Sequence, residues 1–328
     1  MSAAPMRLGI CLRLHSANVE QEFWQCQAAR RLLTTFDVLN ACYNIPLNTM
    51  ILRAFGFGTR ARQWVPTAVL LSLLIAQLLL LALRPVTYRR HRTKIALFNR
   101  IVRLALLTLM AMVQSPGLLD IMRQQHRSAA AGSKSSSWLV FVRKVLGPPL
   151  VYMGHANNVL PFQWVLPMQL YMLFVTSVSV FRSGVCTLAV SASNAEMAAI
   201  VCSYAKQVVF YMSRVVGRAP AGPALAAAAA DTCHGVAAVL LLLLYVHVVM
   251  ILIVPLVIMF RVELSMKAEF VRLRGGCVPQ ALQSLNSDGA MALIAYTLLI
   301  GGWCACESAV AWLGPITCSA SGGVLMLS

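Results

Sequence analysis

The chain is short of charge, and above all of acidic residues. Only 11% of its 328 residues are Asp, Glu, Lys or Arg, and 10 acids stand against 27 basic residues. A soluble domain has about 25% charged residues and is about 45–50% apolar, whereas this chain is 59% hydrophobic. Too little polar surface remains to cover a water-soluble globule of this length. The composition therefore favours a lipid environment.

Catalytic and ligand-binding signatures are also missing. The sequence contains no Gly-x-Ser-x-Gly, GxxxxGK[ST], HExxH or GxGxxG pattern, so none of the common hydrolase, phosphate-binding, zinc or dinucleotide motifs is present. Of the ten cysteines only Cys304 and Cys306 are close together, and no CxxC or Asn-x-Ser/Thr occurs. These absences favour a reduced, non-secretory setting. We predict no catalytic residue, no metal site and no cofactor.

Long uncharged runs are what the sequence does contain. A helix needs about 20 mainly apolar residues to cross about 30 Å of hydrocarbon. Four runs are of this kind, and two further segments are less apolar: 64–83, 159–180, 235–260 and 290–313, then 101–122 and 196–213. We predict an all-α polytopic transmembrane bundle of about five spans, with four to six allowed. The segment 101–122 is the fifth span, and 196–213 is an interfacial or partly buried helix.

The domain organisation follows from these runs. We predict an N-terminal segment at 1–63 that is partly helical or disordered, a bundle at 64–313, and a short tail at 314–328. The bundle includes three loops, one basic and two flexible: 84–103, 128–137 and 218–231. The orientation of the N-terminus stays open, because the positive-inside rule reverses its answer when the span at 101–122 is removed.

The segment 84–103 has seven Lys and Arg residues and no acid. Each cation close to an anionic leaflet contributes about 1 kcal/mol of attraction. We therefore identify four candidates for binding anionic lipid headgroups: Arg89, Arg90, Arg92 and Lys94. An equal alternative is a plain connector whose charges only enforce topology. Because the basic residues gather at the ends of apolar runs, they favour the membrane over nucleic acid as the partner.

Two ionisable residues lie inside predicted spans. Glu307 is an acid within 290–313, and His247 lies near the middle of 235–260. Intramembrane ionisable residues are costly and often functional, as proton relays or ion ligands. Each also has a plain structural interpretation, because Glu307 lies near a helix end and His247 has the length to hydrogen-bond a neighbouring helix.

Three functional classes remain open. The leading one is a non-enzymatic membrane protein of transport-like or channel-like type. The second is a scaffold or assembly subunit that binds other membrane proteins, and the third is a membrane-embedded enzyme that uses Glu307 or His247. The lipid bilayer itself is the one partner common to all three.

Overall fold

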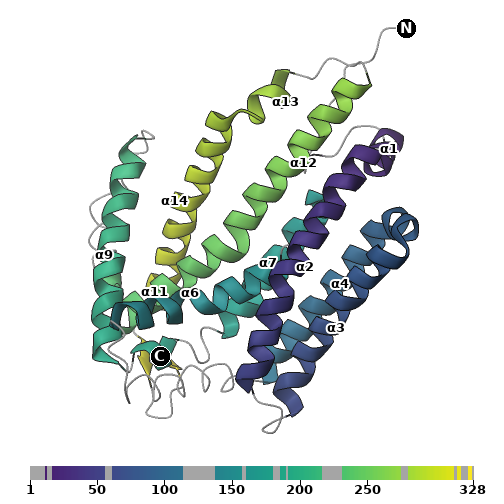
Figure 1. Cartoon of the computed structure of the whole chain (residues 1–328). Coiled ribbons are helices and arrows are strands. Elements are labelled where there is room, and N and C mark those ends of the chain that lie inside the picture. The colour runs from purple at the N-terminus through teal and green to yellow at the C-terminus, as the bar shows by residue number, and fades with distance from the viewer. Residues whose placement is uncertain are drawn as a thin grey trace. The chain divides into compact units, whose positions relative to one another are not determined.

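The computed structural model consists mainly of helices (Figure 1). It describes residues 12, 17–55, 61–113, 137–156, 160–179, 185–189, 191–215, 231–274, 280–313, 316–318 and 324–326. The helices of the first half are α1 (Ala17–Gln25), α2 (Gln27–Phe55), α3 (Ala61–Leu83), α4 (Pro85–Val113) and α6 (Ser137–Ala156). They are followed by α7 (Phe162–Ser179), α8 (Val185–Ala189), α9 (Ala192–Val215), η3 (Asp231–Cys233), α11 (Gly235–His247), η4 (Val248–Ile253), α12 (Val254–Leu273), α13 (Gln280–Leu285) and α14 (Asp288–Leu313). The predicted all-α bundle is confirmed.

Three helices are long and apolar enough to cross a membrane. They are Val65–Leu83 within α3, Gly235–Leu273, and Asp288–Leu313; a shorter apolar helix covers Phe162–Val178. These helices contain most of the four long runs predicted above. Only 28% of the most apolar window of Val65–Leu83 and 17% of that of Asp288–Leu313 is buried within the protein. Their remaining apolar surface has the chemistry that acyl chains solvate.

The observed helix bounds differ from the predicted ones at three places. The basic stretch 84–103 is not a loop, because all of it after Arg84 lies within α4. The run 235–260 continues as helix past Arg261 to Leu273, since charge stops an apolar run but does not stop a helix. The predicted span 101–122 belongs to α4 as far as Val113, where that helix ends. Its remaining residues lie outside the described part of the chain. The predicted loop at 218–231 lies almost wholly outside the described residues, as does the one at 128–137.

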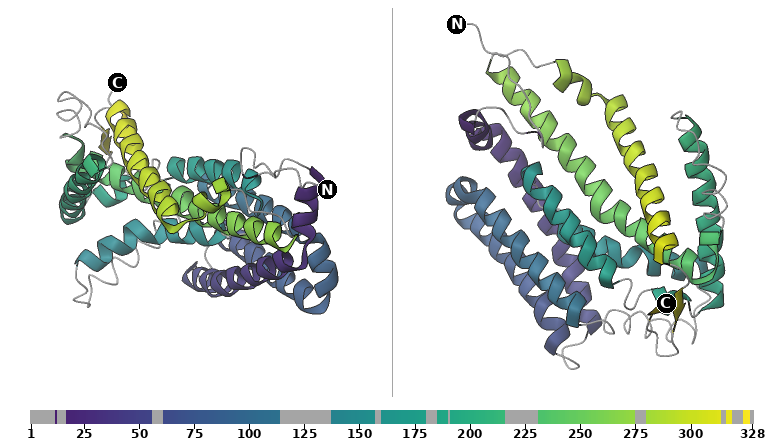
Figure 2. Two further views of the ribbon diagram at one scale, coloured as in Figure 1. Left: turned by 90° about the horizontal axis from the view of Figure 1, so that it is seen from above. Right: turned by 180° about the vertical axis from the view of Figure 1, so that it is seen from behind.

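The chain forms two compact units, each made of discontinuous segments. The first comprises Met1–Leu107, Met153–Met172 and Leu252–Tyr296. Within it α2, α3 and α4 lie side by side, as Figures 1 and 2 show. Its apolar cluster joins α1, α2, α4, α7 and α12, through side chains that include Phe23, Leu33, Val165 and Phe270.

The second unit comprises Thr108–Tyr152, Leu173–Ile251 and Thr297–Ser328. Its core surrounds the buried run from Ala238 to Leu244 on α11, against which α9 and α14 pack. The strands β1 (Ile316–Cys318) and β2 (Val324–Met326) pair antiparallel near its C-terminal end. The predicted short tail at 314–328 therefore contains a small hairpin.

Two disulfides tie this second unit together. Cys186 bonds to Cys318 and Cys202 bonds to Cys233, across 132 and 31 residues of sequence. The prediction of a reduced setting was wrong for these four cysteines. It rested on spacing along the sequence, whereas these partners are brought together only by the packing of α8 and α9 with other elements.

Candidate functional site

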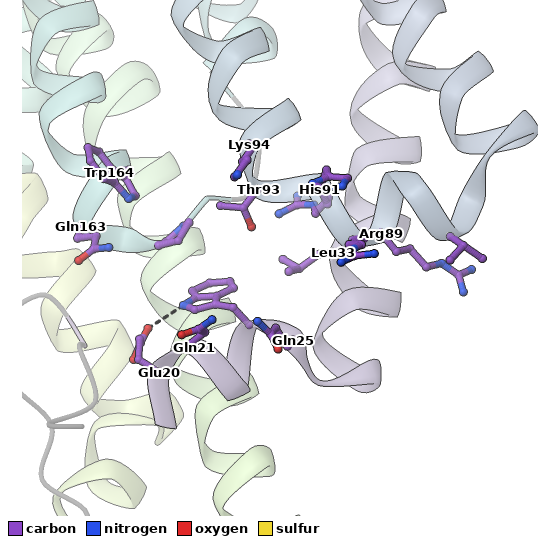
Figure 3. Close-up of a pocket in the computed structure, with 15 residues that line it drawn as sticks. Glu20, Gln21, Gln25, Leu33, Arg89, His91, Thr93, Lys94, Gln163 and Trp164 are labelled. Carbon is purple, nitrogen blue, oxygen red and sulfur yellow. Dashed lines mark hydrogen bonds between the residues drawn. The ribbon is translucent and has the colours of Figure 1, made fainter. Parts of the chain in front are cut away.

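The first unit contains a pocket of about 840 Å³ with a markedly basic wall (Figure 3). Its lining comes from α1, α2, the first turns of α4 and the start of α7. The basic wall includes all four predicted headgroup ligands together with His91. The lining also includes three amide side chains, one acid and two indoles: Gln21, Gln25, Gln163, Glu20, Trp24 and Trp164. In Figure 3 the side chains of Glu20, Gln21 and Gln25 on α1 lie across from those of His91 and Thr93 on α4. A volume between about 300 and 1,000 Å³ is typical of small-molecule sites.

The α4 helix divides the basic run between two faces. The helix starts with Pro85, a residue whose fixed φ suits the first helical position, directly after Arg84. Residues four apart share a face, so Arg90 and Lys94 project together, and both are exposed. Arg92, one of the four candidates, lies on the buried face with 3% of its surface exposed.

Arg92 is committed to a partner inside the protein. Its Nε and Nη2 atoms donate to the two carboxylate oxygens of Asp37 on α2, each at 2.7 Å. The hydroxyl of Tyr88 donates to the same carboxylate at 2.8 Å and accepts from Gln77 of α3 at 2.8 Å. Burial, followed by the nearby Asp37 charge, raises the pKa of Tyr88, so the phenol stays a neutral donor. Asp37 therefore neutralises Arg92, and the exposed basic wall consists of Arg89, Arg90 and Lys94 with His91.

The wall formed by α1 is held by a buried lysine. Lys267 on α12 places its ammonium 2.8 Å from Glu20 and 2.7 Å from Glu263. Glu20 also accepts a hydrogen bond from the indole of Trp24 at 2.7 Å, and Glu263 accepts one from the backbone N–H of Phe162 at 2.6 Å. These contacts join α1 and the start of α7 to α12. Sequence reasoning missed this cluster; the spacing of four between Glu263 and Lys267 was its only local signal.

Glu307 lies in an ion pair within the second unit. Its Oε1 atom is 3.3 Å from the ammonium of Lys206 on α9 and accepts a hydrogen bond from Thr232 at 3.3 Å. His247 is 1% exposed, and its Nδ1 atom is 2.7 Å from the carbonyl oxygen of Leu243. Among the described residues, no hydrogen bond or ion pair joins Glu307 to His247. The structure therefore does not assemble these two candidates into one site.

Metal-ligand clusters are not formed by the described part of the chain, where no group of three or more His, Cys, Asp or Glu side chains is placed to hold an ion. The two disulfides use neither Cys304 nor Cys306. Comparison with protein-family models, curated proteins and solved structures finds no match to this chain. The site is therefore interpreted from its own geometry and chemistry.

Proposed function

We propose that the chain is a multi-pass integral membrane protein whose basic pocket binds the phosphate of an anionic lipid headgroup. The observation that carries this proposal is the gathering of Arg89, Arg90 and Lys94 on the wall of one pocket. The three cations are exposed, and no acid in the sequence lies between residues 38 and 119. Guanidinium groups bind phosphate through paired N–H donors, and the ammonium adds a point charge.

The pocket adjoins helices of membrane-spanning character. Only Arg84 separates the apolar helix Val65–Leu83 from α4, which carries the basic wall. Gln163 and Trp164, which also line the pocket, belong to the first turn of the apolar helix α7. Trp side chains favour the membrane–water interface, and Trp164 is 46% exposed. If α3 and α7 cross the bilayer, the pocket lies at headgroup level.

The disulfides and the charge distribution support one orientation. The helix Gly235–Leu273 starts beside the disulfide-bonded Cys233, and Arg272 and Arg274 lie at its other end. Disulfides persist in oxidising compartments, and basic residues accumulate on the cytoplasmic side. Both criteria support an orientation in which the Cys233 end points away from the cytoplasm. The basic pocket, at the start of α7, then faces the cytoplasmic leaflet, because Cys186 follows the opposite end of that helix.

Headgroup binding is a non-enzymatic role, which agrees with the leading functional class predicted from the sequence. Three further roles stay predictions: transport-like or channel-like activity, a scaffold for other membrane proteins, and an enzyme that uses Glu307 or His247. Lipid binding is compatible with the first two of these, because a bound headgroup orders the helices that form its pocket.

The proposal is tested with soluble short-chain lipids and the full chain in neutral detergent. Binding of dioctanoyl-phosphatidylglycerol and of dioctanoyl-phosphatidylcholine is measured for the wild type and for Arg90→Gln/Lys94→Gln. At about 1 kcal/mol per cation, the double substitution removes about 2 kcal/mol. Affinity for the anionic lipid is therefore expected to fall about thirtyfold.

A charge-matched control is Arg214→Gln/Arg272→Gln, which removes two exposed cations that do not line the pocket. It is expected to retain wild-type affinity. Equal binding of the two lipids by the wild type contradicts the proposal. Equal weakening by the pocket and control variants also contradicts it, since the attraction is then a property of net charge alone.

A further inference from the structure

A second basic residue of α4 has a different environment from the pocket. Arg103 is 1% exposed, and its Nε, Nη1 and Nη2 atoms make no hydrogen bond to any protein atom among the described residues. A guanidinium carries five N–H donors and stays protonated in proteins. A buried charge without a compensating partner costs several kcal/mol. Arg103 therefore needs a counter-charge.

The surrounding helices have no carboxylate left to supply it. From residue 27 to residue 113, which spans α2, α3 and α4, Asp37 is the only acid in the sequence. Both of its oxygens accept hydrogen bonds from Arg92, and Tyr88 adds a third bond. Asp37 does attract Arg103 electrostatically, but no hydrogen bond joins them. One carboxylate cannot neutralise both guanidinium groups.

A third buried cation lies on the same helix. Arg100 is 2% exposed, and its charge and that of Arg103 repel each other. Attraction and repulsion between charges are strengthened in an interior of low dielectric constant. Arg100 therefore cannot supply the counter-charge that Arg103 needs.

The neighbouring face of α2 is polar rather than apolar. Asn48 lies eleven residues after Asp37 on α2, and Arg103 lies eleven residues after Arg92 on α4. Asn48 and Arg103 are therefore at about the same level, roughly 16 Å along the helices from the Asp37–Arg92 ion pair. Eleven residues are about three helical turns. Asn48 is therefore on the same face of α2 as Asp37, and Arg103 is on the same face of α4 as Arg92. Asn48 and Asn44 are fully buried, and their Nδ2 atoms donate to the preceding carbonyl groups along α2. In the part of the structure that is described, the Oδ1 atom of Asn48 has no hydrogen-bond partner, so this stripe makes the packing polar but supplies no counter-charge to Arg103.

We infer that Arg103 binds one small monovalent anion of chloride size within the α2–α4 packing. Burial selects this class of ligand, because a guanidinium that is 1% exposed cannot be reached by a lipid headgroup or an acidic protein segment. Water supplies acceptor atoms but no charge. A single negative charge balances the guanidinium that Asp37 leaves uncompensated, whereas a polyanion would add unpaired charge in the same interior.

The inference is tested by equilibrium dialysis of the full chain in neutral detergent against radioactive chloride, with gluconate holding the ionic strength constant. The wild type is expected to bind about one chloride per chain saturably. Arg103→Gln is expected to lose this saturable binding, and the control Arg214→Gln, which removes an exposed cation, is expected to keep it. Saturable binding that survives Arg103→Gln overturns the inference, as does chloride uptake by the wild type that rises only linearly.

A measurement on the wild type alone covers the case in which Arg103→Gln does not fold. A ligand that binds only the folded protein raises the protein's thermal unfolding midpoint, and the increase grows with the logarithm of the ligand concentration. Replacing gluconate by chloride is expected to raise the midpoint, and replacing gluconate by another bulky organic anion is not. A midpoint that responds equally to both replacements, or to neither, overturns the inference.

Discussion

Asp37 and Arg92 form a two-bond ion pair across 55 residues of sequence, and their side chains are only 1% and 4% exposed. This pair fastens α2 to α4, and through Tyr88 and Gln77 the connection extends to α3 and to Asn99. Because α4 also carries Arg103 and the basic wall of the pocket, the ion pair positions the helix on which both proposed anion sites depend.

Removing one partner of this pair should strongly destabilise the first unit. Asp37→Ala leaves Arg92 buried without its counter-charge, and such changes cost about 3–5 kcal/mol. Thermal unfolding of the detergent-purified protein is the measurement. The double variant Asp37→Leu/Arg92→Met removes both charges and is expected to recover most of the lost stability. A double variant less stable than Asp37→Ala would contradict the ion-pair interpretation.

The ion pair between Lys206 and Glu307 provides a test of the transport hypothesis. The two side chains are 27% and 18% exposed, so solvent screens the pair and its contribution should stay below about 1 kcal/mol. We expect Glu307→Gln and Lys206→Gln to lower the thermal midpoint slightly and to a similar extent. If Glu307 were instead a relay carboxyl, Glu307→Gln alone would abolish solute flux in proteoliposomes while Lys206→Gln retained it.

The two disulfides should be detectable chemically. Alkylation of the unreduced, denatured protein is expected to leave Cys186, Cys202, Cys233 and Cys318 unmodified, and peptide mapping should recover the two cross-linked pairs. Reduction before alkylation is the control. A disulfide typically contributes about 2–4 kcal/mol, so Cys202→Ser/Cys233→Ser should lower the thermal midpoint. Alkylation of all four cysteines without reduction would contradict both the disulfides and the orientation drawn from them.

The apolar helices could be predicted from the sequence because a long uncharged run has few other solutions in a membrane. Both the run at 64–83 and the run at 235–260 lie in helices of spanning character. The helix α4 was harder to recognise, because its buried face is polar and its exposed face is basic. Three polar residues of α4 are buried because they hydrogen-bond to α2 and α3: Tyr88, Arg92 and Asn99. A hydropathy profile does not include such contacts between helices.

The candidate site was predictable in part. Charge density singled out Arg89, Arg90 and Lys94, which do line one pocket. It grouped Arg92 with them because the four are neighbours in sequence, whereas Arg92 is paired with Asp37. The opposite wall was not predictable, since Glu20 meets Lys267 across 247 residues. Contacts of this kind depend on tertiary packing and leave no local pattern.

The length of the Gly235–Leu273 helix determines where its charged end lies. Its 39 residues extend about 58 Å at about 1.5 Å per residue, nearly twice the hydrocarbon thickness of about 30 Å. With Gly235 at one boundary of an untilted helix, the acyl region ends near Val254. A tilted helix keeps more of its length within the bilayer, which brings Lys267 and its two carboxylate partners toward the headgroup level proposed for the pocket that Glu20 lines.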